Sequence, residues 1–361
     1  MIDGLIPREI HDGPDAIRAT LRDARPAADE AAALLRERDV RRVFVIGNGT
    51  SRHSALAASA LYARHAGPGD PVAIALTAGE FRTYRPALGP HDAVVGISAS
   101  GEFGDVVGAF REVGGLVPTV AVVHVPGSTL TGVADRVVVS SGGPSHVPVM
   151  TKTFSATLVA AELTLLALLD PERVAPVHRA IEAAAGHADA VIATTEVAIG
   201  ITLDRLARYE HVFVVGAGIA HYAALEAALK LKEIALVHAE GGETWEATSG
   251  AATLLDERAM VIALAPPGPG RAATADLVRH ARDWGASILE IAADPSVEDG
   301  LLLDLPAGAD EDHATLTTVP PVALLAFALA RSRGLQPDRP EWVARYHSQG
   351  LRHIVGVEEP A

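Results

Sequence analysis

The sequence predicts an α/β protein built from two tandem three-layer αβα sandwiches, each with a parallel sheet. The first observation is an internal duplication, because residues 43–51 (VFVIGNGTS) return as residues 212–220 (VFVVGAGIA). Each copy is a β-branched run, a Gly-x-Gly turn and an Ala/Leu-rich stretch, which is typical of a buried parallel strand that leads into a helix. The second observation is length, since 361 residues correspond to two domains of roughly 150 residues.

The first copy alternates short apolar runs with longer Ala-rich stretches. Runs rich in Val, Ile and Thr predict strands, and the longer stretches predict helices. A helical leader is predicted over 15–38. The predicted strands span 42–47, 71–76, 92–98, 119–125 and 136–140. The predicted helices span 52–66, a stretch from Gly104 onward, and 152–169.

The second copy repeats this alternation after a helical connector predicted over 171–196. Its predicted strands span 211–216, 260–265, 287–292 and 301–305. Its predicted helices span 220–235, 271–284 and 318–333. Helices between consecutive strands act as crossover connections, so both sheets are predicted to be parallel.

Composition excludes several classes of protein. The chain has 30 Lys plus Arg against 45 Asp plus Glu, and a net charge of −15 repels a polyanion, so nucleic acid is not an expected partner. The absence of cysteine excludes disulfides, thiolate metal sites and a cysteine nucleophile. No secretory signal is visible, and the apolar run over 155–169 is shorter than the roughly 20 residues that span a bilayer. We therefore expect a cytoplasmic protein without a membrane segment.

The Gly-x-Gly turn of the first copy has the features of an anion site. A helix N-terminus offers backbone N–H groups and a positive dipole end, and glycine lets a ligand approach the backbone closely. Gly49 is followed by Thr50 and Ser51, whose hydroxyl groups add donors. The second copy has Ile219 and Ala220 at these positions. The sequence therefore predicts one phosphate site per chain.

A second polar loop is predicted at the same edge of the first sheet. It follows the strand predicted over 92–98, and ligands of open α/β sheets bind outside the carboxyl ends of the strands. The loop residues expected to line this crevice are Ser98, Ala99, Ser100 and Gly101. Because no Gly-Lys-Thr sequence is present, a phosphate monoester is favoured over a nucleoside triphosphate. Ordinary turn chemistry is the alternative, since Ser and Gly favour any tight turn.

The helix predicted over 220–235 carries a charged stripe. Glu226, Lys230 and Glu233 are spaced i, i+4, i+7, so two carboxylates and an ammonium group share one face of a helix that is otherwise largely Ala and Leu. Moving a proton between adjacent carbons beside a carbonyl or imine needs one base, and a partly buried carboxylate fits that role. A solvated row of salt bridges is the alternative.

Several segments together resemble proteins with tandem sugar isomerase (SIS) domains. The most specific is 225–240 (LEAALKLKEIALVHAE). The others are the Gly-x-Gly-Thr-Ser turn, Glu80-Phe81-Arg82, the loop Ser98-x-Ser100-Gly101-Glu102 and Thr151-Lys152-x-Phe154. The closest pattern is the isomerase half of glucosamine-6-phosphate synthase, with its stand-alone relatives, the phosphosugar deaminases and fructosamine-6-phosphate deglycases.

The resemblance implies two tandem SIS domains and a homodimer with sites near the domain junctions. The implied division is a helical leader over 1–35, a phosphate-binding domain over 36–185, a domain with the catalytic helix over 186–340, and a tail over 341–361 that closes over the site. The implied ligand is a sugar 6-phosphate held by Thr50, Ser51, Ser98 and Ser100. The resemblance also implies that Glu233 transfers a proton between C1 and C2, with Glu226 and Lys230 nearby.

Some positions depart from the family pattern. Ser249 stands where the synthase has its ring-opening histidine, and serine cannot take that role at neutral pH without a base beside it. His353 stands where the synthase has a sugar-binding lysine, and it either replaces the missing acid and base or belongs to a frayed tail. Ala99 and Phe103 replace polar residues of the phosphate loop. The candidate catalytic residues are Glu233, Glu226, Lys230 and His353, and the candidate substrate-binding residues are Gly49, Thr50, Ser51, Ser98, Ala99, Ser100, Gly101 and Ser249.

The expected function is isomerisation, deamination or deglycation of an amino-substituted sugar 6-phosphate, by ring opening and C1–C2 proton transfer. Glutamine-dependent amidotransfer in this family requires a cysteine, so the synthase activity is not expected. No cofactor and no metal are expected, and Glu240, Glu243 and Glu246 are placed in a loop at the rim of the crevice. The alternative is a catalytically silent sugar-phosphate-binding module that senses a metabolite or regulates a partner, which the loss of the ring-opening histidine favours.

Overall fold

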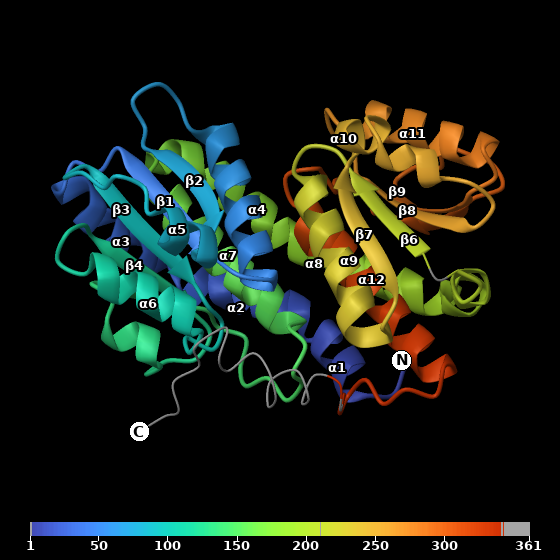
Figure 1. Cartoon of the computed structure of the whole chain (residues 1–361), viewed down its shortest axis with the longest axis horizontal. Coiled ribbons are helices and arrows are strands. Elements are labelled where there is room, and N and C mark those ends of the chain that lie inside the picture. The colour runs from blue at the N-terminus through green and yellow to red at the C-terminus, as the bar shows by residue number, and fades with distance from the viewer. Residues whose placement is uncertain (1, 210, 341, 343–361) are drawn as a thin grey trace. The chain divides into compact units, whose positions relative to one another are not determined.

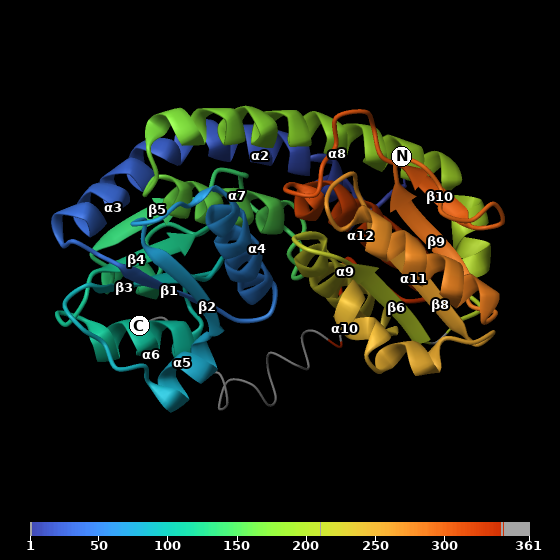
Figure 2. The same ribbon diagram turned by 90° about the horizontal axis from the view of Figure 1, so that it is seen from above.

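The computed structural model describes residues 2–209, 211–340 and 342, which form two compact units (Figures 1 and 2). The first-repeat unit contains residues 15–145 and 152–182. The second-repeat unit contains residues 2–14, 146–151 and 183–340. Each unit has its own sheet, so the predicted fold of two α/β sandwiches with parallel sheets is confirmed.

The sheet of the first-repeat unit has five parallel strands in the order β2-β1-β3-β4-β5. Their bounds are β1 Arg42–Gly47, β2 Val72–Thr77, β3 Asp92–Ile97, β4 Thr119–Val123 and β5 Arg136–Val139. The chain runs from β1 outward to β2 and then returns to β3, so the direction of winding changes between β1 and β3. Open parallel sheets bind ligands at such a point, beyond the carboxyl ends of the strands.

Helices cover both faces of this sheet (Figure 2). The helices are α2 Gly13–Asp23, α3 Arg25–Glu37, α4 Thr50–His65, α5 Ala78–Tyr84, α6 Gly104–Val113, the 3-10 turn η1 Thr129–Gly132, α7 Lys152–Leu166 and the start of α8 Pro171–Leu206. On the face covered by α5 and α6, the rings of Phe44 and Phe81 meet edge to face with centroids 5.7 Å apart. α4 and α7 pack on each other over the other face.

The sheet of the second-repeat unit has the equivalent order β10-β9-β8-β6-β7. Its strands are β6 His211–Gly216, β7 His238–Glu243, β8 Ala259–Ala265, β9 Ser287–Ala292 and β10 Leu301–Asp304. Its helices are α1 Leu5–His11, the end of α8, α9 Ala220–Ala235, α10 Thr244–Thr248, the 3-10 turn η2 Ala251–Leu254, α11 Arg271–Asp283 and α12 Ala314–Ser332. α9 packs on α12, while α11 packs with β8 and β9 around the apolar cluster that contains Phe213 and Leu277.

Strand β7 was not predicted, and its sequence explains why. HAEGGE contains one apolar side chain, Ala239, and no β-branched residue. An edge strand that pairs with β6 alone can form without the apolar pattern of a central strand. The expectation that Glu240, Glu243 and Glu246 lie in a loop is therefore wrong, since the first two lie in β7 and the third lies in α10.

Helix ends also differ from the prediction. The leader consists of the separate helices α1, α2 and α3, and α8 continues to Leu206. α12 begins at Ala314 although Pro320 and Pro321 lie inside it. Proline disfavours a helical residue before it, but this helix is almost entirely buried, so packing outweighs the local preference.

α12 is the one helix among the described residues whose length and composition would allow it to cross a bilayer. Within the second-repeat unit, 83% of the apolar stretch of α12 is buried by other parts of the protein. The burial of α12 therefore accounts for its apolar character as part of the core.

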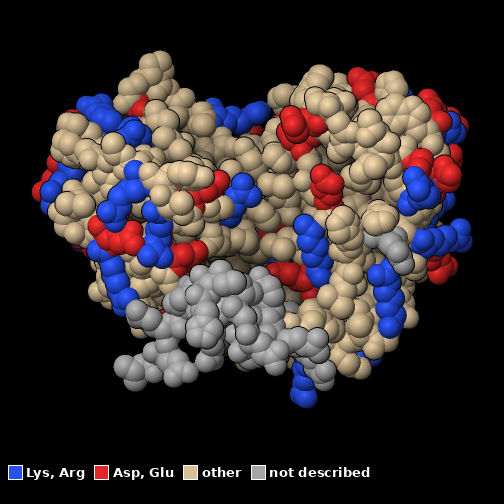
Figure 3. All heavy atoms as spheres, viewed as in Figure 1, with Lys and Arg blue, Asp and Glu red and all other residues tan. Residues whose placement is uncertain are grey.

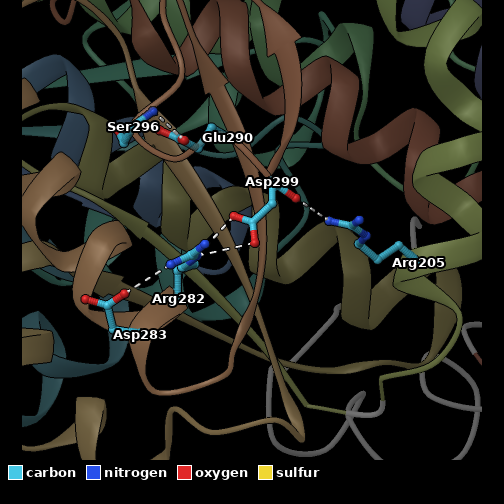
Figure 4. A network of polar contacts seen from close by, with 6 residues as sticks. All are labelled: Arg205, Arg282, Asp283, Glu290, Ser296 and Asp299. Atoms are coloured by element: carbon cyan, nitrogen blue, oxygen red, sulfur yellow. Dashed lines mark hydrogen bonds and ion pairs between the residues drawn. The ribbon is translucent and has the colours of Figure 1, made fainter.

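A polar network fixes the connection between β9 and β10 (Figure 4). Arg282 on α11 donates to both carboxylate oxygens of Asp299, at 3.1 and 3.3 Å, and Arg205 on α8 donates to the Asp299 carbonyl at 3.1 Å. Nearby, the backbone N–H of Ser296 donates to buried Glu290 at 2.7 Å.

On the face of the molecule shown in Figure 3, charged side chains of both signs are interspersed.

Candidate active site

The predicted phosphate turn connects β1 with α4. Gly49 has φ 52° and ψ −127°, a conformation that strains any residue with a Cβ. A Cβ on Gly47 would lie 2.8 Å from the backbone carbonyl of Ser51, so strand and helix approach too closely for a larger residue. No described atom lies within 4 Å of the place where a Cβ on Gly49 would stand. The turn is therefore built from two glycines and is open above the second.

The two predicted loops meet at one edge of the first sheet. β1 and β3 are parallel neighbours, with Ile46 opposite Gly96, so the residues that follow both strands lie side by side. Thr50, Ser51 and Ser98 are buried there, with 6%, 7% and 2% of their surface exposed. The structure thus brings these hydroxyl groups to the edge that the sequence predicts, and their binding of phosphate stays a prediction.

Hydrogen bonds shape the loop that follows β3. The Ser98 Oγ accepts the Gly101 N–H at 3.1 Å, and the Ser100 Oγ accepts the Glu102 N–H at 3.3 Å. Each hydroxyl keeps its own proton, which it can donate to a ligand. Gly101 has φ 69°, and a Cβ there would collide with the Ser128 side chain. Only glycine therefore fits this position without strain.

Glu102 holds the same loop from the other side. Its carboxylate accepts the backbone N–H of Thr129 at 2.9 Å and the Thr129 hydroxyl at 2.6 Å. The Leu130 N–H donates to the carbonyl of Gly101 at 2.9 Å. These bonds fasten the loop to η1, so its hydroxyl groups are held in place before any ligand binds.

Asn48, in the middle of the Gly-x-Gly turn, was missed by the sequence analysis. Its Oδ1 accepts the Ala78 N–H at 3.3 Å, and its Nδ2 donates to Asp105 in the first turn of α6. Burial raises the pKa of Asp105. Asn48 therefore ties the turn to α5 and α6. An amide side chain between two glycines was the available signal, but its partners are set by the fold.

The predicted charged stripe on α9 is a buried ion cluster. Lys230 Nζ lies 3.1 Å from Glu226 Oε1 and 2.6 Å from Glu233 Oε2. The exposed fractions of the side chains are 0% for Glu226, 1% for Lys230 and 35% for Glu233. The alternative of a solvated row of salt bridges is therefore wrong, because two of the three groups are removed from water.

Burial and the neighbouring carboxylates shift the pKa of Lys230 in opposite directions. Burial lowers the pKa of its ammonium, but the carboxylates of Glu226 and Glu233 outweigh this and raise the pKa above its ordinary value. Lys230 is therefore protonated at neutral pH and fixes both carboxylates. Of the two, Glu233 is the one that reaches solvent, so it is the group that a substrate can meet.

Two remaining candidates have different outcomes. Ser249 is exposed at the end of α10, and its Oγ donates to the Trp245 carbonyl at 3.3 Å. Glu243 caps the start of that helix by accepting the N–H groups of Trp245 and Glu246 at 2.6 and 3.0 Å. His353 and the predicted closing tail lie outside the described residues, apart from Trp342. No group of His, Asp or Glu within the described ranges is arranged to hold a metal ion.

The duplicated parallel sheets, each with a glycine turn at its switch point, define a class of tandem α/β-sandwich proteins. Residues 38–167 and 205–330 match the SIS domain family. The chain therefore belongs to the SIS family, and the resemblance inferred from its motifs is confirmed.

Known relatives and solved structures agree with this assignment. The chain is 31% identical over 352 residues to glutamine–fructose-6-phosphate aminotransferase (isomerizing) of Methanothermobacter thermautotrophicus, covering 95% of this chain and 57% of that protein. It is similar in fold to the C-terminal domain of glucosamine-fructose-6-phosphate aminotransferase from Francisella tularensis (TM-score 0.85, 22% identity, 94% and 99% covered). It is also similar to glucosamine-6-phosphate deaminase from Thermotoga maritima (TM-score 0.68, 21% identity, 90% and 97% covered).

Proposed function

We propose that this chain is a phosphosugar isomerase or deaminase that acts on an amino-substituted sugar 6-phosphate, with Glu233 as the base. The observation that carries the proposal is the buried cluster on α9, in which Lys230 holds Glu233 at 2.6 Å while that carboxylate stays 35% exposed. A carboxylate that reaches solvent while a buried charge partner holds it in place is an arrangement that occurs often at functional sites. The names of the relatives, a deaminase and an isomerizing aminotransferase, support the same class of reaction.

The proposal assigns phosphate binding to the first repeat. The turn at Gly49 and the loop at Ser98 offer backbone N–H groups and hydroxyl protons at the N-terminus of α4, which is the environment that a phosphate monoester prefers. Ala99 and Phe103 contribute no side-chain donor. The backbone and the Thr50, Ser51, Ser98 and Ser100 hydroxyls therefore have to supply the contacts.

The proposed chemistry is a proton transfer between adjacent carbons. In the open-chain form of a 2-amino aldose phosphate, Glu233 removes the C2 proton while the C1 oxygen gains a proton, which gives an enolamine. Return of the proton to C1 leaves an imine at C2, and water hydrolyses it to a ketone and ammonia. Isomerisation follows the same path with a hydroxyl group at C2 and no hydrolysis.

Ser249 favours a second function, a silent module that binds a sugar phosphate and regulates a partner. The Ser249 hydroxyl donates to a backbone carbonyl and lies on an exposed helix end, where it has no described base to activate it. On this alternative the first repeat still binds the phosphate, but ring opening does not occur. Binding is therefore shared by both functions, and proton exchange separates them.

Proton NMR in D2O tests both functions together. The purified protein is incubated with hexose 6-phosphates, hexosamine 6-phosphates and a fructosamine 6-phosphate, and deuterium entry at C1 and C2 is followed. We expect exchange with one of the amino-substituted compounds and a loss of at least about 1,000-fold in Glu233→Gln, because the base is removed. The matched control is Glu298→Gln, an exposed glutamate of the same unit.

The possible results lead to different conclusions. Exchange that survives Glu233→Gln removes Glu233 from the reaction. Line broadening without exchange, abolished by Ser51→Ala with Ser98→Ala, establishes the silent binding module instead. Neither exchange nor broadening with any of these compounds overturns the proposal that the ligand is a sugar phosphate.

A further inference from the structure

The second repeat keeps the backbone of an anion-binding turn. β6 ends at Gly216, α9 begins at Ala220, and Gly218 between them has φ 58°. A Cβ on Gly216 would lie 2.6 Å from the carbonyl oxygen of Ala220, the same close approach that Gly47 makes in the first repeat. The loop that follows β8 reaches the same edge of the sheet, because β6 and β8 are parallel neighbours.

A carboxylate of the chain itself lies against this turn. Glu311, in the segment between β10 and α12, has 5% of its surface exposed. Its Oε2 accepts the Gly270 N–H at 2.8 Å, at the residue that precedes α11. A Cβ on Gly218 would collide with its Oε1, and a Cβ on Gly268 would lie 2.6 Å from its Oε2. Gly218, Gly268 and Gly270 thus leave the space that the Glu311 carboxylate occupies.

Backbone groups rather than a cation balance this charge. Among the residues that the structure describes, no lysine, arginine or histidine forms an ion pair with Glu311. The carboxylate instead lies beside Gly218 and Gly270, just before the N-termini of α9 and α11, where helix dipoles and N–H groups favour a negative charge. A buried carboxylate without a cation needs such compensation.

We propose that Glu311 is the resident anion of the second Gly-x-Gly turn, and that it occupies an anion site which free phosphate or formate can fill once the side chain is removed. The site takes an oxyanion because the backbone N–H of Gly270 already donates to one, and because Gly218 and Gly268 leave space for its oxygens. Gly218 remains exposed to solvent, so a dissolved anion can reach the turn. The inference goes beyond the proposed function, since it concerns the repeat that is not assigned to phosphate binding.

Thermal unfolding of Glu311→Ala, in the background Ser51→Ala with Ser98→Ala, tests this inference. That background weakens the first turn, so any response to anions reports on the second. At constant ionic strength in NaCl we expect the unfolding midpoint to fall by about 4–8 °C, because the positive helix ends lose their counter-charge. Replacement of NaCl by 100 mM sodium formate or sodium phosphate is expected to recover about 3–6 °C of this loss.

Two further variants control for other effects. Glu311→Gln keeps the volume of the side chain but not its charge, so it is expected to lose stability and to gain none from formate, because the amide still fills the site. Glu298→Ala removes an exposed carboxylate of the same unit and is expected to show no response. Equilibrium dialysis with labelled phosphate counts the sites directly, and Glu311→Ala is expected to bind one phosphate more per chain than its background.

Three results would overturn the proposal. The first is Glu311→Ala without recovery in either anion and without an added phosphate. The second is an unfolding midpoint of Glu311→Gln equal to that of the protein with Glu311 intact. This comparison remains informative if the alanine variant does not fold. The third is recovery by formate in Glu298→Ala as well, which would make the effect a general response to salt. None of these results depends on whether the protein turns over a sugar phosphate.

Discussion

The two repeats share a backbone design and differ in what their side chains do with it. In the register set by Gly49 and Gly218, Thr50 and Ser51 correspond to Ile219 and Ala220. By the registers of β3 on β1 and of β8 on β6, the loop hydroxyls of Ser98 and Ser100 correspond to Ala265 and Pro267. The buried ion cluster of α9 corresponds to residues 57, 61 and 64 of α4, which are Ala, Leu and Arg. Hydroxyl groups beside the glycine turn occur only in the first repeat, and a buried ion cluster on the helix that follows the turn occurs only in the second.

Under the proposed function, this difference divides two tasks between the repeats. A phosphate turn needs an open space and protons to donate, which the first repeat supplies above Gly49. Acid–base chemistry needs charged groups held away from water, which the second repeat supplies along α9. In the second repeat Glu311 occupies the turn, so the positive helix ends are satisfied without a ligand.

The largest expected effect is on the buried cluster of the second repeat. Lys230→Met is expected to lower the free energy of unfolding by about 3–5 kcal/mol, because it leaves Glu226 buried without its cation. Urea unfolding monitors this loss. The matched change in the first repeat, Leu61→Met, is expected to lower it by less than about 1.5 kcal/mol.

A double variant separates charge from packing at this cluster. Glu226→Gln combined with Lys230→Met removes the unpaired charge, so it is expected to recover most of the lost stability. A double variant as unstable as Lys230→Met alone would show that the lysine stabilises the unit through packing rather than by neutralising Glu226.

The next largest effect concerns the open turn of the first repeat. Ser51→Ala with Ser98→Ala is expected to weaken binding of a hexose 6-phosphate by about 100-fold, because two hydroxyl donors to a charged group are lost. Isothermal titration measures the change. Ser287→Ala in the second repeat serves as the control and is expected to leave affinity unchanged. Equal loss in both variants would break the assignment of phosphate to the first repeat.

A smaller effect distinguishes the two turns by steric coupling. Gly218→Ala places a Cβ against the Glu311 Oε1, whereas Gly49→Ala meets no described atom and suffers backbone strain alone. Glu311→Ala is therefore expected to recover about 1–2 kcal/mol of unfolding free energy in the Gly218→Ala background and none in the Gly49→Ala background. Equal coupling to both glycines in chemical denaturation would contradict the placement of Glu311.

The smallest effect is expected at the surface network of the second repeat (Figure 4). Arg282 and Asp299 have side chains that are 48% and 62% exposed, and exposed ion pairs contribute little. Asp299→Asn is expected to change the free energy of unfolding by less than about 1 kcal/mol. A loss of unfolding free energy as large as that of Lys230→Met would mean that burial does not explain the difference between the Arg282–Asp299 and Lys230–Glu226 pairs.

Local sequence determined how much could be predicted. The strand, turn and helix of each repeat are contiguous, and the stripe of Glu226, Lys230 and Glu233 lies on one helix, so both were visible without a structure. The burial of that stripe was not visible, because it depends on the packing of α9 against α12 and β7.

The features that escaped prediction depend on contacts between distant segments. Glu311 meets Gly218 through the arrangement of β8, α11 and α12, and its own neighbourhood, Asp310 to His313, reads as a polar stretch before a helix. Asn48 lies inside a recognised motif, yet its partners Ala78 and Asp105 come from other elements. The periodicity of apolar residues in a sequence describes one helix or strand at a time, whereas the contacts of Glu311 and Asn48 join several elements.

The packing of α1 has a consequence for how the chain is made. Ile6 and Ile10 are buried, the Ile6 N–H donates to Asp338 at 2.8 Å, and α1 packs on α12 beside Phe327. α1 is translated before both sheets, and α12 is translated after them. During synthesis these two isoleucines therefore lack their partner, which leaves an apolar segment available to a chaperone until translation has passed Asp338.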